Sequence, residues 1–143
     1  SRFTNGDFGV YYAADALETA ISETIYHKER EMAAAGEESI ELTMRCYVGD
    51  IALSMHDLRG GDYLDLHDPN DYSASQSYAA WMRSNGSDGL LYNSVRRPGH
   101  ECIAAFKPIA LTSPIQGEHL KYFYDGQKRR ITHWAKISDA HEV

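Results

Sequence analysis

Three polar side chains recur every four residues near the start of the chain: Thr19, Glu23 and His27. On a helix, residues at this spacing lie one above another along the same face. The ordinary interpretation is a solvated flank that carries an i,i+4 Glu–His pair. The alternative is a row that faces a cleft, with Glu23 as a reactive carboxylate and its two neighbours as supports.

Three other side chains have an ordinary structural role when each is taken alone. An arginine near a terminus, such as Arg2, is usually solvated, and a tyrosine inside a strand, such as Tyr12, is usually a core or cross-strand residue. Ser94 ends an apolar stretch, where a hydroxyl most often satisfies a turn. None of the three indicates a site by itself.

Several well-defined catalytic motifs are absent from the sequence. It contains no GxxxxGK or GxGxxG phosphate loop and no HExxH or CxxC, and its seven histidines form no recognisable ligand set. We therefore expect no metal site. Cys46 and Cys102 form no disulfide framework, which favours a reduced, cytoplasmic protein.

Length and charge restrict the class of protein further. The 143 residues, 43% of them hydrophobic, predict one domain with a real core. The net charge of −7 argues against direct binding of nucleic acid or of an anionic membrane, because neutralising phosphates needs clustered Lys and Arg. No apolar run is long enough for a membrane-spanning helix.

The first half of the chain contains one clear helix between two strands. A strand is expected over residues 8–13, after a turn at 5–7. A helix should begin near Asp15, which has capping-box spacing with Glu18, and end at Met32 or Ala35 before Gly36. Apolar residues then alternate with polar ones as in a strand with one buried face: Ile40, Leu42, Met44, Cys46 and Val48.

The second half is richer in strands. Residues 49–72 indicate mostly loop with one short element. Ser73 and Gln76 have capping-box spacing ahead of a helix over 74–85, which Gly86 closes. Short strands follow at 89–94, 102–106 and 120–124, and the last joins 130–135 through an Asp125-Gly126 hairpin. The predicted fold is α+β, with a compact mixed or antiparallel sheet core and a few helices, because the strands come in runs.

Four segments, taken together and in order, carry a specific pattern. Residues 2–14 read RFTNGDFGVYYAA and residues 17–27 read LETAISETIYH. Residues 88–96 read DGLLYNSVR, and residues 101–108 follow as ECIAAFKP. These segments resemble the RES domain family, which is named for an Arg, a Glu and a Ser.

The resemblance covers roughly residues 2–111, and the tail at 112–143 resembles a C-terminal extension with a hairpin that some longer members have. The chain is therefore interpreted as a single RES-like domain over residues 1–143. Family members usually carry residues ahead of the arginine, so an N-terminal region is expected to be missing.

The resemblance implies a toxin of a bacterial toxin–antitoxin pair that degrades NAD and arrests growth. It implies a fold similar to the ADP-ribosyltransferase toxins and an Xre-type antitoxin as partner, which we expect to block the mouth of the cleft and to supply any operator recognition. NAD is then a substrate, and no prosthetic group is expected. On this resemblance Arg2, Glu23 and Ser94 are catalytic, and the substrate-binding residues are Arg2, Tyr12, Thr19, His27 and Ser94.

Each residue type suits this chemistry. Cleavage of the nicotinamide–ribose bond passes through an oxocarbenium-like centre. The pyridinium leaves as neutral nicotinamide, so a single carboxylate, Glu23, suffices. The fork of Arg2 matches pyrophosphate oxygens, Tyr12 is suited to stack on nicotinamide, and Ser94 is suited to donate to a phosphate or ribose oxygen.

The acceptor stays open at this point. Inorganic phosphate as co-substrate makes the protein a phosphorylase, water makes it a glycohydrolase, and a protein side chain makes it an ADP-ribosyltransferase. The resemblance favours the first two. A non-catalytic interaction module on the same fold is the remaining alternative, although all four motif residues are present.

Overall fold

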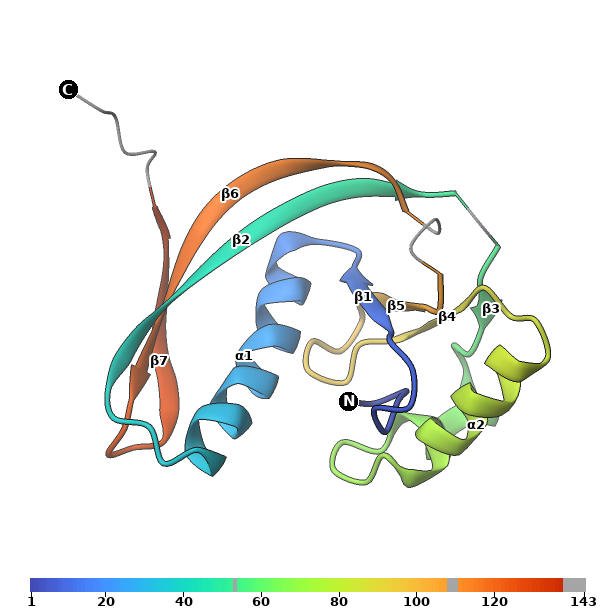
Figure 1. Cartoon of the computed structure of the whole chain (residues 1–143), viewed down its shortest axis with the longest axis horizontal. Coiled ribbons are helices and arrows are strands. Elements are labelled where there is room, and N and C mark those ends of the chain that lie inside the picture. The colour runs from blue at the N-terminus through green and yellow to red at the C-terminus, as the bar shows by residue number, and fades with distance from the viewer. Residues whose placement is uncertain (53, 108–110, 138–143) are drawn as a thin grey trace. The chain divides into compact units, whose positions relative to one another are not determined.

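A computed structural model describes residues 1–52, 54–107 and 111–137 (Figure 1). The chain divides into two compact units, one formed by Ser1–Ala20 and Asp50–Thr112 and the other by Ile21–Gly49 and Ser113–Val143. The elements, in chain order, are β1 (Tyr11–Ala14), α1 (Leu17–Ala34), β2 (Ile40–Ile51), β3 (His56–Asp57), the 3-10 helix η1 (Gly61–His67), α2 (Ser73–Ser84), β4 (Gly89–Asn93), β5 (Glu101–Ala105), β6 (Leu111–Asp125) and β7 (Arg130–Ile137).

The first unit is built on a four-stranded sheet in the order β1-β5-β4-β3. β5 pairs antiparallel with both β1 and β4, and the short β3 runs parallel to β4. In this register Ala104 faces Tyr12 on one side and Leu90 on the other. The sheet is mixed and accompanied by helices, which confirms the predicted α+β class.

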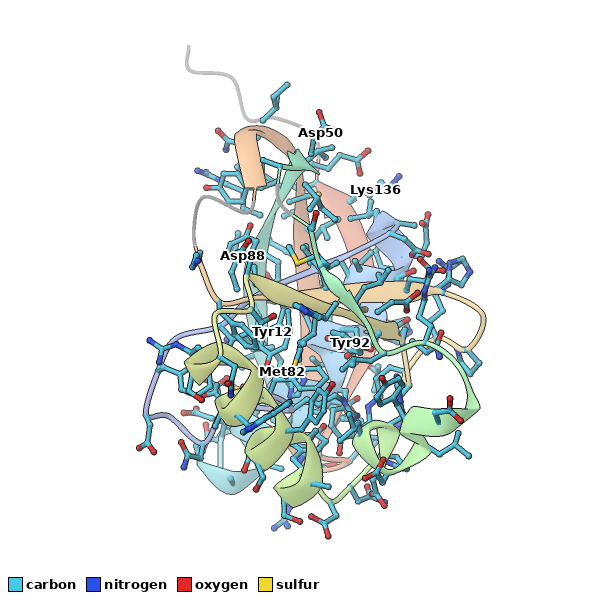
Figure 2. The ribbon with its side chains drawn as sticks, turned by 90° about the vertical axis from the view of Figure 1, so that its right-hand side faces the viewer. Tyr12, Asp50, Met82, Asp88, Tyr92 and Lys136 are labelled. Carbon is cyan, nitrogen blue, oxygen red and sulfur yellow. The ribbon has the colours of Figure 1, made fainter. Side chains whose placement is uncertain are left out.

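The core of this unit lies between the sheet, η1 and α2. Phe3 is fully buried, and its ring meets that of Tyr92 edge-on, with 4.8 Å between the ring centroids. Met82 of α2 belongs to the same cluster as Tyr92 (Figure 2). Burial of a large apolar side chain contributes about 1.5–3 kcal/mol, so Phe3 anchors the N-terminal segment in the core.

The second unit combines the part of α1 from Ile21 onward with a three-stranded sheet in the order β2-β6-β7. β2 and β6 run side by side along most of their length (Figure 1). β6 and β7 form an antiparallel hairpin, as predicted, and Asp125 Oδ1 accepts the N–H groups of Gln127 and Lys128 in its turn. Thr24 of α1 shares a 2.7 Å hydrogen bond with the buried Tyr122 hydroxyl of β6.

Both predicted helix ends are confirmed at glycines. Gly36 has a φ of 66° and Gly86 a φ of 87°, in the left-handed region that side chains avoid. Behind α2, Gly86 N–H donates to the carbonyl of Arg83, and the next N–H reaches back to Met82. This pairing closes the last turn of the helix in the usual glycine-dependent way.

The capping box predicted for α2 is wrong. The helix begins at Ser73 with Tyr72 as its N-cap, and no side chain caps it. Gln76 instead donates to the carbonyls of Ser1 and Thr4, at 2.8 and 3.2 Å. The Gln76 side chain, which the local sequence pattern predicted to cap the helix, therefore binds the N-terminal segment instead.

Two strand predictions also need correction. β1 begins at Tyr11 and not at residue 8, because Thr4 Oγ1 donates to the Phe8 carbonyl and holds the preceding residues in a turn. In β2, Ile40 and Val48 are exposed, at 45% and 62% of their surface. A 12-residue strand is about 40 Å long. This is roughly twice the length of the part of α1 that belongs to the same unit, so the helix can cover only the middle of β2 and leaves both ends of the strand exposed.

Residues 49–72, predicted as mostly loop with one short element, contain both β3 and η1.

Candidate functional site

Arg2 is buried in the first unit, with 5% of its surface exposed. Its Nη1 donates to the carbonyls of Leu66 and Asp68, at 3.3 and 2.8 Å, and its guanidinium lies 4.6 Å above the ring of Tyr72. Ser75 Oγ donates in turn to the Arg2 carbonyl at 2.6 Å. Within the described part of the chain, Nε and Nη2 donate to no other protein group, so one nitrogen holds the side chain and leaves the rest of the fork for an anion.

Tyr12 is tied to the same N-terminal segment. Its hydroxyl accepts the N–H of Phe3 at 3.0 Å and shares a 2.9 Å hydrogen bond with Ser1 Oγ. Burial raises the pKa of Tyr12, although the Ser1 hydroxyl, the Phe3 N–H and the Arg2 charge each work against the rise. The phenol is therefore neutral at pH 7, and the side chain keeps 36% of its surface exposed.

Ser94 lies directly after β4, in a tight turn that leads to β5. It is buried, its N–H donates to the His100 carbonyl at 2.8 Å, and its Oγ accepts the Arg97 N–H at 3.0 Å. The turn role that is ordinary for such a serine is thus confirmed. It also fixes the position of the Ser94 hydroxyl.

Thr19 is fully buried, so it does not belong to a solvated flank. Its Oγ1 donates to Asp15 Oδ1 at 2.8 Å and accepts from Arg97 Nη1 at 2.9 Å. Asp15 Oδ2 lies 3.2 Å from His100 Nδ1 and accepts the Glu101 N–H at 3.1 Å. Desolvation alone would raise the pKa of Asp15, but these hydrogen bonds together lower it below its ordinary value.

These contacts connect the predicted site residues of the first unit in two pairs, Thr19 with Ser94 and Arg2 with Tyr12. Thr19 is connected to Ser94 through Arg97, which binds both of them. Arg2 lies near Tyr12, because the N–H of Phe3, the next residue after Arg2, donates to the Tyr12 hydroxyl. The charge of Arg2 accordingly acts to lower the pKa of that phenol.

Glu23 and His27 follow Thr19 by about one and two turns along α1 and belong to the second unit. Glu23 is half-buried, whereas His27 is exposed and its ring centroid lies 5.4 Å from that of Tyr26. Both side chains therefore lie in a different unit from Arg2, Tyr12, Thr19 and Ser94.

Sequence reasoning did not assign roles to several residues of the site. Arg96 donates to the Pro69 carbonyl and, at 3.2 Å, to the Tyr72 hydroxyl, which brings a second guanidinium to the ring under Arg2. Arg97 makes the link to Thr19. The available signal was two adjacent arginines, two and three residues after Ser94, in a chain with only 14 Lys and Arg.

Two broader features bear on the site. Among residues 1–52, 54–107 and 111–137, no group of three or more His, Cys, Asp or Glu is arranged to hold a metal ion. None of the helices in those ranges is long and apolar enough to cross a membrane.

The first unit thus combines a mixed sheet with helices, and backbone groups hold its buried Arg2, its exposed Tyr12 and its turn residue Ser94. A family model for the RES domain matches residues 1–125 of the chain. The chain belongs to the RES domain family, and the predicted resemblance is confirmed. It is similar to the uncharacterized protein y4oC of Sinorhizobium fredii (strain NBRC 101917 / NGR234), with 25% identity over 129 residues. That stretch is 89% of this chain and 53% of the relative, so the chain spans about half the length of y4oC.

Proposed function

We propose that the chain is the toxin-like module of a bacterial toxin–antitoxin pair and that it cleaves the nicotinamide–ribose bond of NAD. Membership of the RES family supports a toxin-like module of this type. The observation that carries the NAD proposal is the state of Arg2: a buried guanidinium, held through one nitrogen, with the rest of its fork available. In a chain of net charge −7, such a local cation is what a dinucleotide pyrophosphate requires.

In this proposal Arg2 binds the pyrophosphate and the Tyr12 ring stacks on nicotinamide. The bond from ribose C1′ to the ring nitrogen breaks, and its electron pair neutralises the pyridinium. An oxygen of phosphate or water forms the new bond at C1′. With phosphate the products are nicotinamide and a phosphorylated ADP-ribose; with water they are nicotinamide, ADP-ribose and a proton.

Glu23 stabilises the positive charge that develops on the ribose, or binds one of its hydroxyls. Ser94 donates to a phosphate or ribose oxygen, and Thr19 and His27 support this arrangement from the same row of α1. Removing a preorganised electrostatic group of this kind costs roughly 3–4 kcal/mol of barrier, which is on the order of a hundredfold to a thousandfold in rate.

The test is to incubate the folded chain with NAD, with and without inorganic phosphate, and to identify the products by phosphorus NMR and chromatography. Phosphorylated ADP-ribose that appears only with phosphate supports the phosphorylase, and ADP-ribose in both tubes supports the glycohydrolase. Glu23→Gln should lose activity while its circular dichroism is unchanged. Glu31→Gln is the matched control, since Glu31 lies on the same helix with its side chain 61% exposed. Equal activity of the two variants contradicts the role of Glu23.

The partner follows from the same proposal. An Xre-type antitoxin is expected to restore growth and to cover Arg2 and Glu23 in the complex. This is tested by solving the complex or by hydrogen exchange of the chain with and without the antitoxin. Arg2 is already only 5% exposed in the free chain, so Glu23 is the informative side chain, and a complex in which Glu23 keeps the exposure it has in the free chain contradicts this mode of inhibition. Because the chain is acidic, we expect operator binding only through the antitoxin, and we expect the pair in the cytoplasm.

A further inference from the structure

The imidazole of His67 lies between two backbone groups that differ in chemistry. Its Nδ1 is 2.8 Å from the carbonyl oxygen of Tyr63, and its Nε2 is 3.1 Å from the amide nitrogen of Asn93. A carbonyl only accepts and an amide N–H only donates, so the two partners leave a single assignment. Nδ1 carries the proton, Nε2 offers its lone pair, and the ring is neutral.

The place of this ring along β4 explains why an acceptor is needed there. β3 ends at Asp57, and the last backbone-to-backbone hydrogen bond that the described residues form on that edge of β4 is from the Leu58 N–H to the Leu91 carbonyl, at 2.7 Å. Asn93 is two residues further on, so its N–H points to the same edge, beyond the end of β3. His67 Nε2 accepts this N–H and replaces the strand that is missing there.

The same three residues, Leu66 to Asp68, also hold Arg2. Arg2 Nη1 donates to the carbonyls on both sides of His67, those of Leu66 and Asp68. Ser94 follows Asn93 directly in the chain. One short segment therefore fixes the arginine through its carbonyls and the serine turn through its imidazole. The ring of His67 also lies 6.4 Å from that of Tyr92.

We propose that His67 is a positioning residue that, in its neutral Nδ1–H form, sets the distance between Ser94 and the Arg2 fork. This inference rests on the proposed function, because it takes Arg2 and Ser94 as the groups that bind the substrate. His67 itself touches neither the substrate nor the reacting atoms in this account. What it contributes is one hydrogen-bond acceptor at the position of Nε2.

Two amide variants separate the two nitrogens of the ring. In His67→Gln the side-chain oxygen reaches the position of Nε2 and accepts the Asn93 N–H, whereas in His67→Asn the shorter amide reaches only the position of Nδ1. We expect His67→Gln to keep kcat/KM for NAD within about threefold of the unmodified chain. His67→Asn should lose about tenfold, the equivalent of one hydrogen bond. His133→Asn, an exposed histidine of β7, is the matched control and should change nothing.

A spectroscopic measurement tests the arrangement without NAD. In long-range proton–nitrogen NMR spectra at neutral pH, the His67 ring should show the pattern of the Nδ1–H tautomer. The amide signals of Asn93, Ser94 and Arg97 should move in His67→Asn and stay nearly in place in His67→Gln.

The proposal is overturned by a ring protonated at Nε2, by equal kcat/KM for the two amide variants, or by a Ser94 amide signal that ignores both substitutions. If the unmodified chain leaves NAD intact while the tautomer and the amide shifts are as expected, the proposed function fails and the positioning role of His67 stands.

Discussion

Replacing Thr19 with valine tests the polar network that joins the start of α1 to the serine turn. Valine has nearly the same shape but no hydroxyl, so Asp15 Oδ1 loses a donor and Arg97 Nη1 loses an acceptor. Hydrogen bonds to charged groups contribute about 1.5–3 kcal/mol each. Because the Asp15 side chain is 36% exposed and Arg97 half-buried, water replaces part of each bond, and we expect a total loss of about 2 kcal/mol.

Urea unfolding followed by circular dichroism measures this loss. With a slope of about 2 kcal/mol per molar, which is typical of small proteins, the midpoint of Thr19→Val should fall by about 1 M. Thr43→Val is the matched control, because Thr43 is an exposed residue of β2. Its free energy of unfolding should change by less than about 0.5 kcal/mol.

The pH dependence identifies Asp15 as the partner. The hydrogen bonds lower the pKa of Asp15 in the folded chain, despite the opposing desolvation, so their stabilisation is present above the ordinary value of about 3.9. It is lost as the pH falls through the folded value. The stability gap between the unmodified chain and Thr19→Val should therefore be largest near neutral pH and shrink below about pH 4. An unchanged midpoint at pH 7 would refute the network, and a gap that does not depend on pH would refute the role of Asp15 in it.

Three other substitutions have defined outcomes. Gly89→Ala should destabilise the chain by about 1–3 kcal/mol in urea unfolding, because a Cβ at this position would lie 2.6 Å from the Ala104 carbonyl oxygen; a neutral result would contradict the close approach of β4 and β5. Tyr122→Phe removes the hydrogen bond to Thr24 and should cost about 1 kcal/mol. Burial raises the pKa of Tyr122, so the free energy of unfolding of the unmodified chain should fall as the pH rises past 10, and that of the phenylalanine variant should fall less. The same dependence of stability on pH above 10 in both chains would argue against this. Arg2→Lys keeps the charge but not the fork, and affinity for ADP-ribose, measured by calorimetry, should fall about tenfold or more; unchanged affinity would remove Arg2 from the pyrophosphate site.

The sequence by itself determined the elements that depend on local chemistry. The glycines after both α-helices were recognised because the left-handed backbone at Gly36 and Gly86 is a local requirement. The Asp125 hairpin was recognised for a similar reason, since its carboxylate accepts from the N–H groups two and three residues further on. The family was also evident from the sequence, because the spacing of Arg2 and Glu23 and the motif around Ser94 are readable without the fold.

Only the tertiary structure decided which polar groups the site residues bind. Gln76 had the spacing of a helix cap but binds the carbonyls of Ser1 and Thr4, because the N-terminal segment that the buried Phe3 anchors against α2 brings these backbone groups within its reach. Arg2 looked like a solvated terminal residue, yet the burial of the neighbouring Phe3 draws it against Leu66 and Asp68, more than sixty residues away.

The same holds for His67 and Thr19. Nothing local distinguishes His67 from the other histidines; its hydrogen bond with the Asn93 N–H forms because β3 ends at Asp57 and leaves that N–H without a strand partner. Thr19 has the period of a helix flank, but the turn after β4 covers it with Arg97. Periodicity reports which face of a helix a residue occupies, whereas the partner on that face comes from a distant segment, and only the folded chain brings the two together.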